Sequence, residues 1–161
     1  MHGGKKWLAR DTEKPVIWEK PLKKDVVGML NDVGFIEVTK QDVDNTHPMK
    51  WYCRQYKKFV GIYGKLLTID LLIFDQEHFP NKLSVELKYQ SVGGSVDEKF
   101  PFVIQNMRKL FRDHGLKGLL LLNGGGYNTN AVKWSKGQQD ENLFVVEGRS
   151  DIYNWIEENL A

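Results

Sequence analysis

The stretch 66-LLTIDLLIFD-75, followed by 83-LSVELKYQ-90, decides the fold of this chain. Both segments are rich in aliphatic and aromatic residues and are separated by a polar turn, which predicts two adjacent strands. Because side chains alternate between the faces of a strand, one face of the second strand carries only polar residues: Ser84, Glu86, Lys88 and Gln90. Asp70 stands inside the apolar run of the first strand, where a carboxylate is costly unless it is paired, hydrogen-bonded or bound to a metal. Two acids and a lysine therefore form either a buried ion pair or a functional site.

Length and composition limit the class of protein. The chain has 161 residues, of which 41% are hydrophobic and 27% are charged. This length suits one domain with a proper core, and the composition excludes both a disordered chain and a long apolar membrane segment. We expect a soluble protein with an N-terminal arm over residues 1–20 and a single domain over residues 21–161.

Cysteine content and net charge give further limits. Cys53 is the only cysteine, which excludes an intramolecular disulfide and a multi-cysteine zinc site, and no secretory signal heads the chain. We therefore expect a reducing, cytoplasmic setting. The net charge of +2 is ordinary, so it permits binding to a polyanion without arguing for it.

Periodicity along the rest of the chain predicts an α/β protein. Apolar residues at helical spacing indicate a helix over 21–33, ended by Gly34, and a second helix over 100–114, ended by Gly115. Four consecutive leucines over 119–122 indicate a strand that is buried on both faces. Further strands are expected over 35–39, 66–75, 82–90 and 143–146, a strand or hairpin arm over 51–63, and further helices over 129–136 and 150–160. The order is helix, three or four strands, helix, strand, helix, strand, helix.

An Asp on one strand and Glu-x-Lys on the next is the arrangement needed for metal-dependent phosphodiester hydrolysis. Asp70 and Glu86 can hold a hard cation such as Mg²⁺, and the backbone carbonyl of Leu87 can add a third oxygen ligand. Such a cation neutralises charge that develops on the phosphate and acidifies a bound water. Lys88 lies on the same face as Glu86, where it can orient that water or contact a phosphate oxygen.

The structural alternative is an ordinary ion pair between Glu86 and Lys88, with Asp70 at a strand end. Glu-x-Lys occurs often by chance, so the isolated motif favours this alternative. Its position within the predicted element order changes that balance.

The element order, with the motif on its middle strands, resembles the PD-(D/E)XK nuclease superfamily. The resemblance covers roughly residues 21–122, and its specific part is Ile69-Asp70 followed by Val85-Glu86-Leu87-Lys88. It implies a restriction-endonuclease-like α/β core, in which a mixed central sheet is flanked by helices in the order αβββαβ, followed here by a C-terminal αβα. It also implies that Asp70 and Glu86 bind the metal and that Lys88 assists the attacking water.

Two positions depart from the family pattern. Ile69 stands where the family name places a proline. The acidic residue that some members carry on the first helix has no clear counterpart, and Glu19 and Asp25 are the candidates.

The resemblance implies a Mg²⁺-dependent endodeoxyribonuclease, with Mn²⁺ as a substitute metal. Its expected partners are double-stranded DNA and further copies of the chain in a homodimer or larger homo-oligomer, because cutting both strands needs two active sites. A restriction or homing enzyme fits a compact site-specific nuclease. The alternatives are a structure-selective nuclease, such as a Holliday-junction resolvase, and a nucleic-acid-binding module with an idle site.

Further polar residues are candidates for roles around this site. Gln90 can hydrogen-bond a phosphate or a metal-bound water, although a polar strand end is an equally good interpretation. An aromatic and basic pattern suggests phosphate contacts to DNA from five cations: Lys5, Lys6, Arg54, Lys57 and Lys58. Solvated lysines beside a hydrophobic strand are the alternative. The glycines at 124–126 lack a phosphate-loop signature and indicate a turn.

Overall fold

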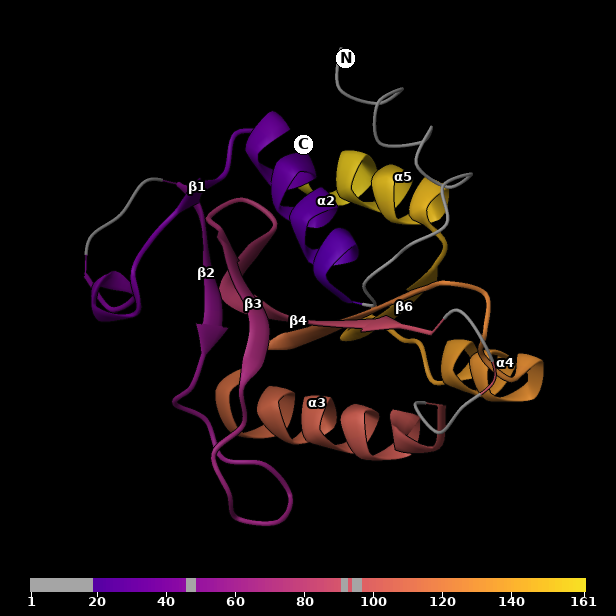
Figure 1. Ribbon diagram of the computed structural model, residues 1–161. Coiled ribbons are helices and arrows are strands. Elements are labelled where there is room, and N and C mark those ends of the chain that lie inside the picture. Colours follow the sequence, from indigo (N-terminus) through magenta and orange to yellow (C-terminus); the bar gives the residue numbers. More distant parts are fainter. Residues whose placement is uncertain (1–18, 46–48, 91–92, 94–96) are drawn as a thin grey trace.

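A six-stranded mixed sheet forms the centre of the protein, with helices on both of its faces (Figure 1). The computed structural model describes residues 19–45, 49–90, 93 and 97–161. The strands lie in the order β1-β2-β3-β4-β5-β6, so each strand is a neighbour of the next one along the chain. The expected α/β class, with a mixed sheet flanked by helices, is confirmed.

The chain begins its described part with helix α2 and alternates helices and strands after a run of four strands. The elements are α2 (Glu19–Asp32), β1 (Ile36–Glu37), η2 (Lys40–Asp42), β2 (Lys50–Tyr56), β3 (Ile69–Asp75), β4 (Phe79–Tyr89), η3 (Asp97–Lys99), α3 (Phe100–His114), β5 (Lys117–Asn123), α4 (Thr129–Gly137), β6 (Leu143–Glu147) and α5 (Arg149–Leu160). No helix in these stretches combines the length and the apolar character needed to cross a membrane.

Strand directions follow from the length of each connection. β2, β3 and β4 form an antiparallel meander, while β5 and β6 run parallel to β4. A parallel neighbour requires a crossover, which α3 provides between β4 and β5 and α4 provides between β5 and β6. β1 is a two-residue edge strand parallel to β2. The short edge limits pairing with other chains.

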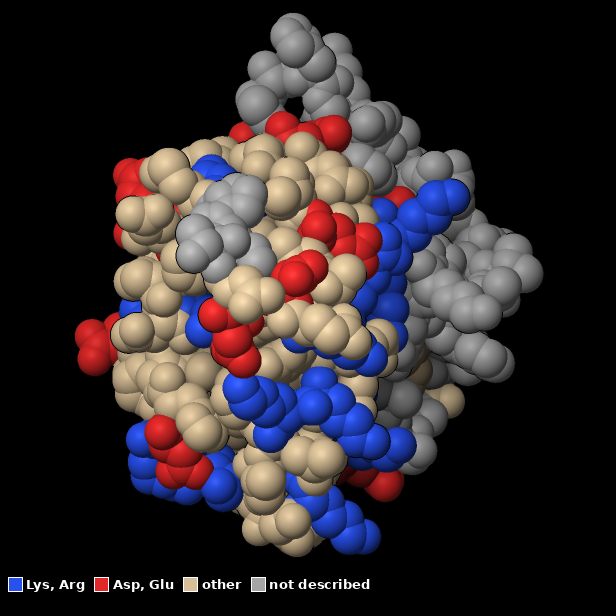
Figure 2. All heavy atoms as spheres, turned by 90° about the vertical axis from the view of Figure 1, so that its left-hand side faces the viewer, with Lys and Arg blue, Asp and Glu red and all other residues tan. Residues whose placement is uncertain are grey.

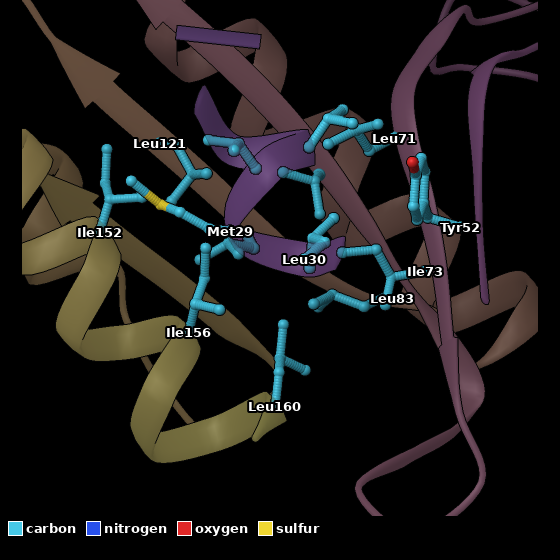
Figure 3. Close-up of a cluster of buried hydrophobic side chains, with 14 of the residues drawn as sticks. Met29, Leu30, Tyr52, Leu71, Ile73, Leu83, Leu121, Ile152, Ile156 and Leu160 are labelled. Atoms are coloured by element: carbon cyan, nitrogen blue, oxygen red, sulfur yellow. The ribbon is translucent and has the colours of Figure 1, made fainter. Parts of the chain in front are cut away.

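Two apolar layers hold the sheet between the helices. On one face, side chains from α2 and α5 pack against β3, β4 and β5 (Figure 3). On the other face, α3 and α4 cover β5 and β6, and a neighbouring cluster joins α3 to β2 and β3. Residues Gly118 to Leu122 of β5 are all buried, which confirms a strand covered on both faces.

A strand or hairpin arm is expected over residues 51–63, and in the structure the strand ends at Tyr56. Gln55 has a φ of 50°, in the left-handed region that few non-glycine residues adopt, and β2 ends one residue later. Residues 57–68 instead form a hairpin loop, closed by an antiparallel bridge between Val60 and Leu66 and projecting beside α3 (Figure 1). The strand therefore ends where the backbone leaves the extended conformation.

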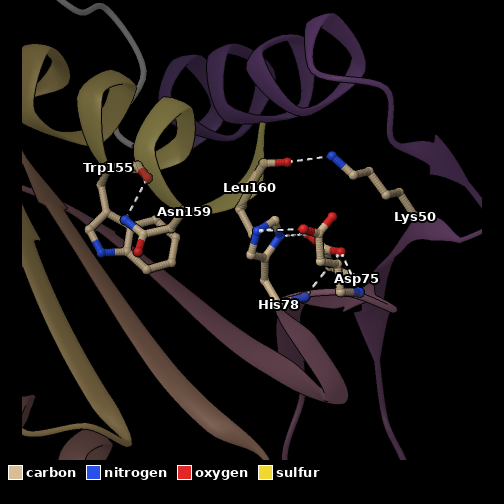
Figure 4. Close-up of polar contacts among 7 residues, drawn as sticks. Lys50, Asp75, His78, Trp155, Asn159 and Leu160 are labelled. Atoms are coloured by element: carbon tan, nitrogen blue, oxygen red, sulfur yellow. Dashed lines mark hydrogen bonds and ion pairs between the residues drawn. The ribbon is translucent and has the colours of Figure 1, made fainter.

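A buried carboxylate holds the turn between β3 and β4 (Figure 4). Asp75 is 1% exposed, and its Oδ1 accepts hydrogen bonds from the backbone N–H groups of Glu77 at 3.0 Å and His78 at 3.3 Å. Its Oδ2 lies 2.8 Å from His78 Nδ1. Nearby, Lys50 Nζ donates to the Leu160 carbonyl at 2.7 Å and ties the end of α5 to β2. These contacts fix how β3 and β4 enter their shared turn.

Replacing Asp75 with alanine should lower the free energy of unfolding by about 1–3 kcal/mol or more, because buried donors would lose their acceptor. Urea denaturation followed by circular dichroism measures this change. Glu77→Ala is the matched control, because the Glu77 side chain is 75% exposed, and it should stay within about 0.5 kcal/mol of wild type. Equal effects of the two substitutions would contradict the role assigned to Asp75.

Candidate active site

Asp70 lies where the backbone pairing of β3 and β4 stops. The two strands are in register through the pair Leu71 and Val85, and one step further along the same register Asp70 stands opposite Glu86. Here the Asp70 side chain contacts the neighbouring strand: its Oδ2 accepts a hydrogen bond from the Leu87 N–H at 2.9 Å. Asp70 is therefore fastened to the centre of the Glu86-Leu87-Lys88 segment.

The same contact tells which way the Leu87 carbonyl faces. In a strand, the N–H and C=O groups of one residue are directed toward the same neighbouring strand. Since the Leu87 N–H is directed to Asp70, its carbonyl is also on the β3 side. The oxygen expected from sequence as a third metal ligand thus lies on the Asp70 side of β4.

Glu86 and Lys88 pair with each other, with 2.9 Å between Lys88 Nζ and Glu86 Oε1. Their side chains are 22% and 18% exposed, so the pair is partly buried. Both line a cleft of about 240 Å³ between the sheet and α3, and Ser84 lines it with them. Ser84, Glu86 and Lys88 thus lie on one side of β4, as strand alternation predicts, whereas Gln90, expected on the same face, does not line this cleft.

Two residues that sequence reasoning missed complete the surroundings of Asp70. Lys23 of α2 places its Nζ 3.3 Å from Asp70 Oδ1, and Gln55 Nε2 donates to the same oxygen at 3.5 Å. Helical periodicity predicts which face of α2 is buried, but it does not predict that the Lys23 side chain reaches Asp70 of β3. The unusual backbone of Gln55 likewise has no sequence signal.

The oxygen atoms offered by Asp70, Glu86 and the Leu87 carbonyl are chemically suited to a hard cation. Two carboxylates and a backbone carbonyl are all oxygen ligands, which Mg²⁺ and Mn²⁺ prefer over nitrogen or sulfur. Within the described residues, no group of three or more His, Cys, Asp or Glu side chains comes together, so a cation here would use Asp70, Glu86, the Leu87 carbonyl and water. Lys23 is the positive group that balances the Asp70 charge in the structure.

The candidate acid on the first helix, Asp25, has another partner. Asp25 is 1% exposed, and its Oδ2 lies 2.9 Å from Nη2 of Arg149, which is itself buried. This ion pair joins α2 to the start of α5 inside the protein. The side chain of Glu19, the other candidate, lies outside the described residues.

Gln90 is bound to the glycine loop that follows β5. Its Nε2 donates to the Gly126 carbonyl at 2.8 Å, and the Gly126 N–H donates to the Gln90 carbonyl at 2.6 Å. A Cβ on Gly124 would lie only 2.4 Å from that carbonyl, so the close approach requires glycine. Gln90 thus holds the loop against the end of β4, and a role toward phosphate remains a prediction.

Of the expected DNA-binding cations, the three among the described residues are exposed, and two of these have acidic partners. Arg54 Nη2 lies 2.9 Å from Glu37 Oε1, and this hydrogen bond raises the Arg54 pKa. Lys58 Nζ lies 2.9 Å from an Asp44 oxygen, which raises the Lys58 pKa and lowers that of Asp44.

Lys57 is also exposed, and Lys5 and Lys6 lie outside the described residues. Figure 2 shows Lys and Arg side chains gathered in a band across the side of the molecule formed by the β1–β2 edge. Contact of these cations with DNA remains a prediction.

Cys53 is 1% exposed, and its burial raises the pKa of the thiol above its ordinary value. A buried thiol with a raised pKa is a poor nucleophile at neutral pH. Cys53 is therefore a packing residue of β2.

Comparison with known proteins gave one match. A family model described as "PD-(D/E)XK nuclease superfamily domain" matches residues 18–154. Neither the curated proteins nor the solved structures gave a significant match. The matched range includes every described strand and the first half of the last helix.

Asp25→Asn should lower the free energy of unfolding by about 3–5 kcal/mol, because it leaves the Arg149 charge buried without its counter-charge. Chemical denaturation measures this loss. The double variant Asp25→Leu with Arg149→Met should recover a large part of it, since neither charge is then buried. A single variant as stable as wild type would show that the pair does not hold α2 and α5 together.

Proposed function

Because the chain belongs to the PD-(D/E)XK nuclease superfamily, we propose that it hydrolyses DNA phosphodiester bonds at Asp70, Glu86 and Lys88 with Mg²⁺ as its cofactor. The observation that carries this proposal is the 2.9 Å hydrogen bond between the Leu87 N–H and Asp70 Oδ2. It joins Asp70 of β3 to the Glu86-Leu87-Lys88 segment of β4. A chance surface ion pair would not require this contact.

Each residue has a role in the proposed reaction. Asp70, Glu86 and the Leu87 carbonyl would hold the cation, which would supply charge neutralisation at the phosphate and a more acidic water. The Lys88 ammonium, held by Glu86, orients the attacking water and donates to a phosphate oxygen. Lys23 balances the charge of Asp70 and thereby lowers the cost of placing two carboxylates close together.

We further propose a site-specific endonuclease that acts on double-stranded DNA as a homodimer, in a restriction or homing role. One chain supplies one Asp–Glu–Lys site, while a double-strand break needs two hydrolytic events in opposite strands. Exposed cations on the β1–β2 side, Arg54, Lys57 and Lys58, would contact the phosphate backbone. Mn²⁺ has the same preference for oxygen ligands and should replace Mg²⁺.

Plasmid cleavage in Mg²⁺ tests the assignment of the site. Asp70→Asn and Lys88→Ala should each slow cleavage by about 10²-fold or more, because each removes a group that acts on the developing charge. Asp151→Asn and Lys133→Ala, two exposed positions on α5 and α4, are matched controls that should cut at the wild-type rate. Undiminished cleavage by the Asp70 and Lys88 variants would disprove the assignment.

Metal binding gives a test that does not depend on activity. Saturating Mg²⁺ should raise the midpoint of thermal unfolding of the wild type, with a stabilisation of about 2.7 kcal/mol at a hundredfold excess over the dissociation constant. Asp70→Asn combined with Glu86→Gln should abolish this increase, while Asp151→Asn should retain it. An equal increase in all three proteins would place the cation elsewhere.

A further inference from the structure

Two exposed aromatic rings pack against each other, and one of them, Phe102, lines the Glu86–Lys88 cleft. Tyr63, in the 57–68 loop, is 74% exposed, and Phe102, in the first turn of α3, is 38% exposed. Their ring centroids are 5.1 Å apart and their planes are inclined by 30°. Single exposed apolar residues are ordinary, but adjacent exposed aromatic rings beside a cleft are a candidate binding surface.

The 57–68 loop is held firmly against α3. Asn106 is 6% exposed, and its Oδ1 accepts the Ile62 N–H at 2.9 Å. A Cβ on Gly61 would lie 2.7 Å from both Asn106 Oδ1 and a methyl carbon of Leu67, so the backbone approaches α3 as closely as glycine permits. This anchor lies next to Tyr63 and fixes where its ring is presented.

The aromatic pair reaches the cleft of the candidate catalytic residues through Phe102. Phe102 lines it together with Glu86 and Lys88, and so does Lys99 from the turn before α3. Most of the remaining lining is apolar, including Leu67 and Val103. Lys65 lies at the exposed tip of the same loop.

Apolar walls, exposed aromatic faces and flanking cations are the combination by which proteins bind unpaired nucleic-acid strands. A stacked base in a duplex offers its edges but not its faces, so an aromatic ring gains most from a base that has left the stack. Lys65 and Lys99 supply the charge that complements the adjacent phosphates. An apolar peptide would not use these cations.

We propose that Tyr63 and Phe102 receive an unstacked nucleobase next to the scissile phosphodiester. This inference rests on the proposed nuclease function and narrows its DNA substrate to sites that carry an unpaired or easily unstacked base at the cleavage position. The two rings act as a positioning platform that brings the backbone to Glu86 and Lys88. Fully stacked duplex should bind less tightly than a strand with an unpaired base.

Binding of a single-stranded oligonucleotide that contains 2-aminopurine tests this proposal in EDTA, where cleavage cannot occur. Stacking on an aromatic ring should quench the fluorescence of the 2-aminopurine in the wild type. Tyr63→Ala and Phe102→Ala should each weaken binding by about 5- to 150-fold and restore the fluorescence. Tyr63→Phe should bind as wild type does, because it keeps the ring.

Trp134→Ala is the matched control, since Trp134 is an exposed aromatic residue of α4 that does not line the cleft. It should change neither binding nor fluorescence. Thermal unfolding of each variant tests whether the fold is retained. We expect it to be retained, because both rings are exposed and contribute little to the core. Unchanged binding by the two alanine variants would overturn the proposal, as would equal weakening for a fully paired duplex and the single strand.

Plasmid cleavage by wild type, measured separately, distinguishes the two proposals. Cleavage that persists while the alanine variants bind normally would leave the nuclease proposal standing and remove the stacking platform. Quenched binding by a wild type that cuts nothing in Mg²⁺ or Mn²⁺ would support the platform and overturn the nuclease proposal.

Discussion

The hydrogen bond from the Leu87 N–H to Asp70 Oδ2 is the contact on which the arrangement of the site depends. β3 and β4 pair through their backbones as far as Leu71 and Val85, and beyond that point a carboxylate replaces the backbone carbonyl as the acceptor. The strands can then separate without leaving a buried N–H unsatisfied. Because the Leu87 N–H has Asp70 as its acceptor, this end of the two strands can form a ligand site.

Packing elsewhere in the fold stabilises the protein and offsets the loss of backbone pairing between β3 and β4 beyond Leu71. The α2–α5 layer and the α3–α4 layer press on opposite faces of the sheet and bury the apolar side chains of β4 and β5. The Asp25–Arg149 ion pair fixes α2 against α5, and α2 in turn carries Lys23 to Asp70. The ion pair between Asp25 and Arg149 therefore helps to position the Lys23 charge beside Asp70.

Glu86 and Lys88 share one cleft with α3 and the 57–68 loop. The Glu86–Lys88 pair forms part of its wall, α3 forms another part, and the 57–68 loop is fastened to α3 through Asn106 and Ile62. At the end of β4, the Gln90 side chain likewise anchors a loop, because it donates a hydrogen bond to the Gly126 carbonyl in the glycine loop at 124–126. Rigid supports on both sides of the Glu86–Lys88 segment favour a preorganised site.

The sequence by itself determined the class of fold, the order of its elements and the common face of Ser84, Glu86 and Lys88. Each of these depends on local periodicity, because alternation along a strand and helical spacing are properties of neighbouring residues. Only the tertiary structure decided that β2 ends at Tyr56, that Lys23 and Gln55 meet Asp70, and that Asp25 pairs with Arg149. These contacts join residues from different elements, and periodicity within one element carries no information about which polar side chain of another will face it.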